Sequence, residues 1–166
     1  MLDRSDIEKN LRQIDKLYAS SSSVQEGLYY SKLATLELCG WIEHSMDSIV
    51  LSLAKQLIRD MKLQSYFEDE VVGKIYGFGY DKRLKRMLIP LVGLVGLEAM
   101  ERKVNPRVFE PMRASLNALK PNRDNLAHGY IRGVTPHLDA PSVVLGRFHT
   151  VHAGLVNIES VLKALK

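Results

Sequence analysis

Cysteine is nearly absent from this chain of 166 residues, in which Cys39 is the single thiol. One thiol allows no internal disulfide, which argues against a small secreted domain held together by disulfides. It also argues against zinc bound by several thiolates, because no Cys-x-x-Cys pair exists. The sequence therefore predicts no disulfide scaffold, no metal site and no cofactor.

Long apolar runs are also missing. The longest covers residues 87–97 and is interrupted by Pro90, Gly93 and Gly96. It is far shorter than the roughly 20 residues that a membrane-spanning helix needs, so we expect a core helix there and no membrane partner. Three of the first six residues are charged, Asp3, Arg4 and Asp6, and the segment does not resemble a signal peptide, which favours a cytoplasmic protein.

What remains is an ordinary globular composition with a weak basic excess. Apolar residues make up 46% of the chain, which is enough for a hydrophobic core and too much for a disordered segment. The formal net charge of +4 permits nucleic-acid binding without requiring it.

Apolar residues recur at helical spacing along most of the chain, and no run alternates convincingly as a strand does. The sequence predicts an all-α bundle of about five to six helices, one of them long, in a single domain of residues 1–166. Two Ser-x-x-Glu pairs, Ser5 with Glu8 and Ser23 with Glu26, are typical of capped helix starts.

The positions of proline, glycine and capping residues predict where each helix begins and ends. The second helix runs without proline from Val24 to Met61, on the order of 55 Å, and Gly40 is a place where it could kink. A short helix before residue 73 is compatible with the pattern. The other predicted helices are Lys82–Met100 capped by Asp81, Pro106 to about Lys120 capped by Asn105, a helix that Asn122 caps and whose end Gly129 and Gly133 flank, and Ser142–Leu165.

The stretch from Asn122 to Tyr130 contains Arg123, Asp124 and His128, which together suit RNA cleavage without a metal. Histidine titrates near neutral pH and can accept the proton of a 2′-hydroxyl. Arginine stays cationic and binds phosphate with a planar fork. On an ideal helix positions 123 and 128 are about 140° apart, so we expect Arg123 in a loose first turn, next to the positive end of the helix dipole.

The segment RDNLAHG, residues 123–129, resembles the Arg-polar-x3-His signature of the HEPN superfamily. The segment LELCGWIEHSMD, residues 36–47, also resembles the branch of ribonuclease L and prokaryotic defence proteins. The resemblance implies a metal-independent endoribonuclease that cleaves single-stranded RNA to a 2′,3′-cyclic phosphate. It also implies a homodimer that joins two motifs in one cleft, with Arg123, Asp124 and His128 as catalytic residues.

Tyr130 extends the match to Arg-x4-His-x-Tyr, the form found in HEPN toxins whose partner antitoxin modifies the tyrosine with AMP. We therefore expect a toxin or anti-phage defence effector with a possible antitoxin or defence partner protein. Tyr130, Asn125 and Glu43 are candidate regulatory or site-lining residues, although Glu43 could equally be a polar-face residue.

The basic run Lys82, Arg83, Lys85 and Arg86 is either a solvated helix face or a set of RNA contacts. Two alternatives to the enzyme also stay open. One is a catalytically silent HEPN module for dimerisation in a larger assembly. The other is a helical bundle in which the motif is coincidental, with Arg123 and His128 as ordinary helix-end residues.

Overall fold

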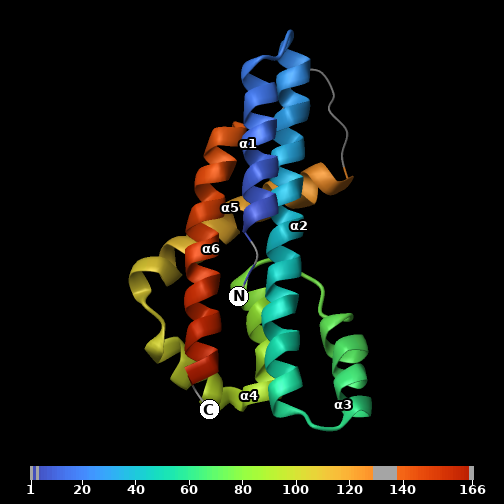
Figure 1. The fold of residues 1–166 in the computed structure, drawn as a ribbon, viewed down its shortest axis with the longest axis vertical. Helices are drawn as coiled ribbons and strands as arrows, with labels where there is room; N and C mark the ends of the chain where they lie inside the picture. Colours follow the sequence, from blue (N-terminus) through green and yellow to red (C-terminus); the bar gives the residue numbers. More distant parts are fainter. Residues whose placement is uncertain (1, 3, 129–137, 165–166) are drawn as a thin grey trace.

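The structure is a computed structural model that describes residue 2, residues 4–128 and residues 138–164. Within these residues every regular element is a helix, which confirms the predicted all-α bundle (Figure 1). The elements are α1 Ser5–Ala19, α2 Val24–Leu57, α3 Met61–Tyr66, η1 Phe67–Val72, η2 Tyr80–Leu84, α4 Lys85–Lys103, α5 Pro106–His128 and α6 Pro141–Ala164. The segments η1 and η2 are π-helical.

The long helix α2 is the centre of the bundle. It packs against α1 and α6, and α5 packs on both α2 and α6 (Figure 1). Its buried face carries Leu38, Ile42 and Met46, and from α6 Phe148 and Leu155 are buried in the same core. Each such side chain contributes roughly 1.5–3 kcal/mol when it is removed from water, so this core holds the helices in place.

The predicted start of α2 is confirmed at its capping residue. Ser23 Oγ accepts a hydrogen bond from the backbone N–H of Glu26 at 3.2 Å. The Glu26 carboxylate accepts from the backbone N–H of Ser22 at 2.7 Å, one residue earlier than in a reciprocal capping box. The first contact satisfies an N–H group that a helix start leaves free.

The predicted end of α2 at Met61 is wrong, because the helix ends at Leu57. Ile58 has an extended backbone, and Asp60 then caps α3 by accepting from the N–H groups of Lys62 and Leu63. The 34 residues of α2 span about 51 Å. Its backbone does not break at Gly40, so the predicted kink is absent from this described helix.

Two predicted caps are wrong because their carboxylates bind arginines instead. At α1 the N-cap is Arg4, and Glu8 is bound by Arg4 at 2.9 Å and Arg12 at 2.7 Å. At η2 the N-cap is Gly79, and Asp81 is bound by Arg113 at 3.1 Å. Glu8 and Asp81, which the local pattern assigned to helix capping, therefore form ion pairs with arginines.

The longest apolar run, residues 87–97, lies in α4 as expected for a core helix, but only part of it is buried. Gly93 has φ 66° and ψ 177°, which breaks the helix at a conformation that glycine tolerates. Leu88 and Leu97 are buried, whereas Leu94 and Val95 are exposed beside the break. No helix among the described residues is long and apolar enough to cross a membrane.

The predicted division of α5 after Lys120 is wrong. The start is as expected, since Asn105 Oδ1 accepts from the Arg107 N–H at 3.0 Å, but the helix continues through Pro121 to His128. Pro121 removes one backbone donor, a loss that the burial of side chains on both sides of it offsets. Leu119 and Leu126, seven positions apart, are both buried and keep one face of the helix on the core.

Candidate active site

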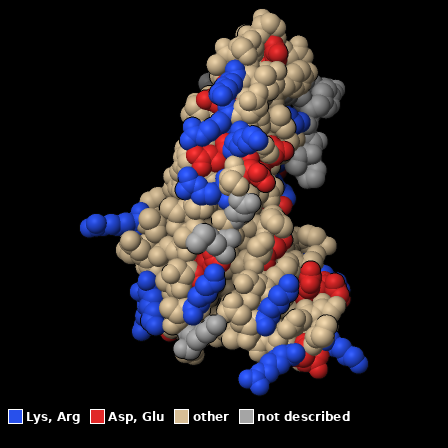
Figure 2. All heavy atoms as spheres, in the orientation of Figure 1, with Lys and Arg blue, Asp and Glu red and all other residues tan. Residues whose placement is uncertain are grey.

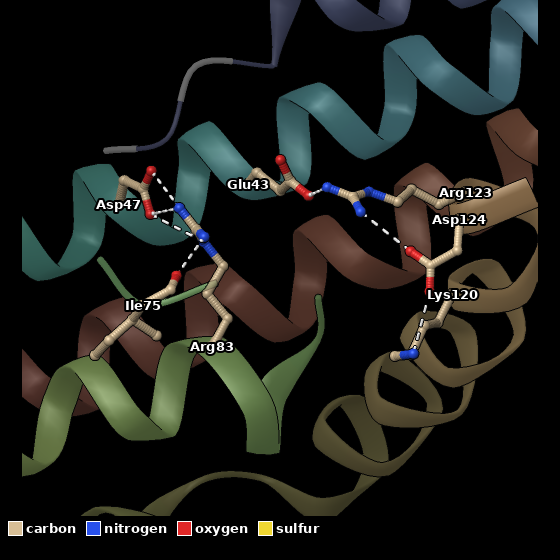
Figure 3. A network of polar contacts seen from close by, with 7 residues as sticks. All are labelled: Glu43, Asp47, Ile75, Arg83, Lys120, Arg123 and Asp124. Carbon is tan, nitrogen blue, oxygen red and sulfur yellow. Dashed lines mark hydrogen bonds and ion pairs between the residues drawn. The ribbon is translucent and has the colours of Figure 1, made fainter. Parts of the chain in front are cut away.

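Arg123 joins the end of α5 to the middle of α2. Its Nη2 donates to Glu43 Oε1 at 2.8 Å, and its Nη1 donates to Asp124 Oδ1 at 3.0 Å (Figure 3). About a third of the Arg123 side chain is exposed, and Glu43 is exposed to a similar extent. The guanidinium is therefore held in one position while part of it remains open to solvent.

The polar contacts continue along α5. Asp124 also accepts from Lys120 Nζ at 3.2 Å, one helical turn earlier. The four side chains Lys120, Asp124, Arg123 and Glu43 thus alternate in charge from α5 to α2, as Figure 3 shows. Two cations face two anions, so the network as it stands has no excess charge to attract a phosphate.

The protonation states follow from these contacts. Hydrogen bonds from Arg123 and then Lys120 hold the pKa of Asp124 below its usual value. Burial alone would lower the pKa of Arg123, but its hydrogen bond to Asp124 and the charge of Glu43 outweigh burial and raise it. Arg123 is a permanent cation, and Asp124 is a carboxylate at neutral pH.

The motif does not lie at a helix N-terminus. The helix α5 begins at Pro106, so the expectation that Arg123 lies in a loose first turn beside the positive end of the helix dipole is wrong. Positions 123 and 128 lie on one continuous helix, on which they are about 140° apart. Asn125 is exposed. His128 is the last residue of α5, but its side chain lies outside the described residues, and so does the whole of Tyr130.

Two residues near Arg123 were not predicted. Lys120 carries the outer end of the charge network, and its four-residue spacing to Asp124 is a sequence signal that would have found it. Cys39 lies one turn before Glu43 on α2 and is buried. Burial, and then the Glu43 carboxylate, raises the pKa of Cys39 to about 12, so the thiol is not a nucleophile here.

The basic run contributes one residue to this region. Arg83 binds both carboxylate oxygens of Asp47 at 2.8 Å and donates to the backbone oxygen of Ile75 at 2.9 Å. Asp47 is four residues after Glu43, and Figure 3 shows the two ion pairs side by side along α2. Lys85 is bound to Glu101 at 2.9 Å, while Lys82 and Arg86 are exposed.

No continuous basic track crosses the described residues on the face drawn in Figure 2, where basic and acidic side chains are interspersed. In the described part of the chain, no three His, Cys, Asp or Glu side chains are grouped so that they could hold a metal ion. The chemistry available around Arg123 is therefore a fixed guanidinium with carboxylate and ammonium neighbours.

Comparison with known proteins adds no family to this geometry, because no family model, no curated protein and no solved structure matches the chain.

Proposed function

We propose that this protein is a HEPN-like, metal-independent endoribonuclease that cleaves single-stranded RNA. The observation that supports it is the partly exposed guanidinium of Arg123, held between Glu43 and Asp124. Two hydrogen bonds use two of the five guanidinium N–H groups, which leaves donors for the oxygens of a phosphate.

In the proposed reaction His128 accepts the proton of a 2′-hydroxyl, and the 2′-oxygen attacks the adjacent phosphorus. The 5′-oxygen of the next nucleotide leaves and takes up a proton, so the products carry a 2′,3′-cyclic phosphate and a 5′-hydroxyl. Arg123 stabilises the negative charge that accumulates on the phosphate oxygens during the attack. No redox step or metal ion is needed for this balance.

In this proposal the protein acts as a homodimer. One motif offers one cation and one base, whereas cleavage also needs a group that protonates the leaving oxygen, which the motif of the second protomer would supply. A toxin or defence role, with a partner protein that controls Tyr130, follows from the motif resemblance. Light scattering at micromolar concentration tests the dimer, and a purely monomeric protein would argue against a composite site.

A second function, a catalytically silent interaction module, is favoured by a specific feature of the same site. Glu43 and Asp124 together neutralise Arg123, and an arginine neutralised in this way also fastens α5 to α2. Under this alternative the ion pairs stabilise the bundle and have no substrate to bind.

A cleavage assay separates the two functions. The protein is incubated in excess EDTA with a long unstructured RNA, and the new ends are tested for a 5′-hydroxyl and a cyclic phosphate. The control for Arg123→Ala is Arg147→Ala. Arg147 lies on α6 and forms a similar half-buried ion pair with Asp139 at 2.9 Å. We expect parental cleavage in EDTA that Arg123→Ala abolishes and Arg147→Ala retains. Absence of cleavage by the parent would favour the silent module.

A further inference from the structure

A cavity of about 620 Å³ opens beside the candidate site, between α2 and η1. Its polar and aromatic lining includes His44 and Asp47 from α2, Glu68 and Asp69 from η1, Tyr76, and Arg83 from η2. Its size is in the range of pockets that take small organic ligands. Asp47 lies four residues after Glu43, so the cavity begins about 6 Å along α2 from the residue that holds Arg123.

Two of the lining residues, Arg83 and Asp47, form an ion pair that has no net charge. Arg83 uses Nε and Nη2 on Asp47 and Nη1 on the backbone oxygen of Ile75 (Figure 3). Only 13% of the Arg83 side chain is exposed. A guanidinium so completely engaged is a poor site for a second phosphate, so the cavity must recognise some other part of a ligand.

Apart from His44 and the Ser48 hydroxyl, the polar groups left over in the cavity are acceptors and an aromatic ring. The Glu68 side chain is exposed, and no contact to its carboxylate is found in the described part of the chain. Asp69 accepts one long hydrogen bond, from Ser65 Oγ at 3.4 Å. Tyr76 is 79% exposed, which leaves its ring free to stack. Leu51 and Val72 add apolar lining.

From these groups we infer that the cavity is a base subsite for guanine, in the nucleotide next to the phosphate that Arg123 holds. Guanine offers two adjacent donors, N1–H and the exocyclic amino group, which match the two oxygens of a carboxylate. Uracil has no amino group and presents mainly acceptors to the same carboxylate. The base stacks on Tyr76, and Glu68 is the carboxylate that reads its edge.

Charge supports a base in this position. With Asp47 neutralised by Arg83, the remaining charge of the lining comes from Glu68 and Asp69, which repel phosphate and favour hydrogen-bond donors. Glu43, which binds Arg123, lies one helical turn before Asp47 at the edge of the cavity, a separation on the order of that between the phosphate and the base of one nucleotide. The inference rests on the proposed function for its place beside a cleavage site, but base binding is measured without cleavage.

Titration with the four nucleoside 5′-monophosphates tests the subsite directly, since the four share one phosphate and differ in the base. Binding is followed by NMR at the amide of Gly73, which lines the cavity. We expect GMP to bind about tenfold more tightly than UMP, because a bidentate contact to a base discriminates on that order. Equal binding of GMP and UMP, or no shift at Gly73, would overturn the inference.

Variants identify the residues. Tyr76→Ala is expected to weaken GMP binding on the order of tenfold, while Tyr76→Phe keeps the ring and the affinity. Tyr66→Ala is the matched control, because Tyr66 is also well exposed but does not line the cavity. Glu68→Gln is expected to remove the preference for GMP over UMP. Unchanged GMP binding in Tyr76→Ala, or an unchanged preference in Glu68→Gln, counts against the assignment.

Mapping of RNA cleavage positions separates this inference from the proposed function. Cleavage next to guanine that becomes indiscriminate in Glu68→Gln supports both. Cleavage with no base preference overturns the guanine subsite and leaves the ribonuclease standing. Selective GMP binding without any cleavage of RNA overturns the ribonuclease and leaves a guanine-binding cavity.

Discussion

Replacing Glu43 by alanine tests whether this residue positions Arg123 for chemistry. The ion pair is 2.8 Å long, and its side chains are 28% and 31% exposed, between a surface pair and a buried one. Surface pairs contribute up to about 1 kcal/mol, and breaking a buried pair costs about 3–5 kcal/mol. We expect a loss of about 1–2 kcal/mol in the free energy of unfolding, measured by urea denaturation.

The effect on cleavage is expected to exceed the effect on stability. Without Glu43 the guanidinium keeps only its contact to Asp124, on its own helix. Misplacement of a group that contacts the reacting phosphate lowers the rate by about 10²-fold in well-organised sites. The assay is single-turnover cleavage of a labelled RNA, and Glu43→Gln is expected to recover part of the rate because its amide oxygen still accepts a hydrogen bond.

Asp139→Ala is the matched control, since it breaks the comparable ion pair with Arg147, which involves neither α2 nor α5. It is expected to lower stability to a similar extent without changing the cleavage rate. In the Arg123→Ala background, Glu43→Ala is expected to change the rate no further, because its effect acts through Arg123. A parental rate in Glu43→Ala, or additive losses in the double variant, would refute this reasoning.

Three further results are expected. A Cβ at Gly154 would lie 2.5 Å from Met112 Cβ, so Gly154→Ala should lower the free energy of unfolding by about 1–3 kcal/mol, measured by urea denaturation. Gly146 has open space where a Cβ would be, so the control Gly146→Ala should be neutral or slightly stabilising. The Cys39 thiol is buried and its pKa is raised to about 12, so a thiol reagent at pH 8 should label it only after unfolding; rapid labelling of the native protein would contradict this. The pKa of Asp124 is lower in the folded protein than its unfolded-state value of about 4. Its contribution to stability is therefore present above about pH 4 and is lost as the pH falls through the folded-state pKa. Between pH 6 and pH 3 the urea midpoint should fall more in the parent than in Asp124→Asn.

The helical fold could be predicted because its signal is repeated many times. On α2 and α6 the apolar positions recur every three or four residues, and each one is a separate indication of the same buried face. The division of α5 was predicted from Pro121 and Asn122 alone. A proline removes a single hydrogen bond, and the burial of Leu119 and Leu126 on one face outweighs that local effect.

The sequence indicated most residues of the candidate site, including Glu43 as a site-lining candidate, but not how they contact one another. Arg123 and Asp124 stand in a short motif, and Lys120 could have been added from its spacing. The contact between Arg123 and Glu43 joins residues 80 positions apart, which no local pattern specifies. The ion pair of Arg83 could not be predicted for the same reason, because its partner Asp47 is distant in sequence.

The most direct test of the central proposal is the single-turnover rate of RNA cleavage in the parent, in Arg123→Ala, in His128→Ala and in the double variant. If the two residues serve one transition state, each single change lowers the rate by about 10²- to 10⁴-fold, and the double variant is little worse than the slower single variant. Melting curves should show that all four proteins remain folded. Parental cleavage by a folded His128→Ala protein would contradict the assignment of this motif as an active site.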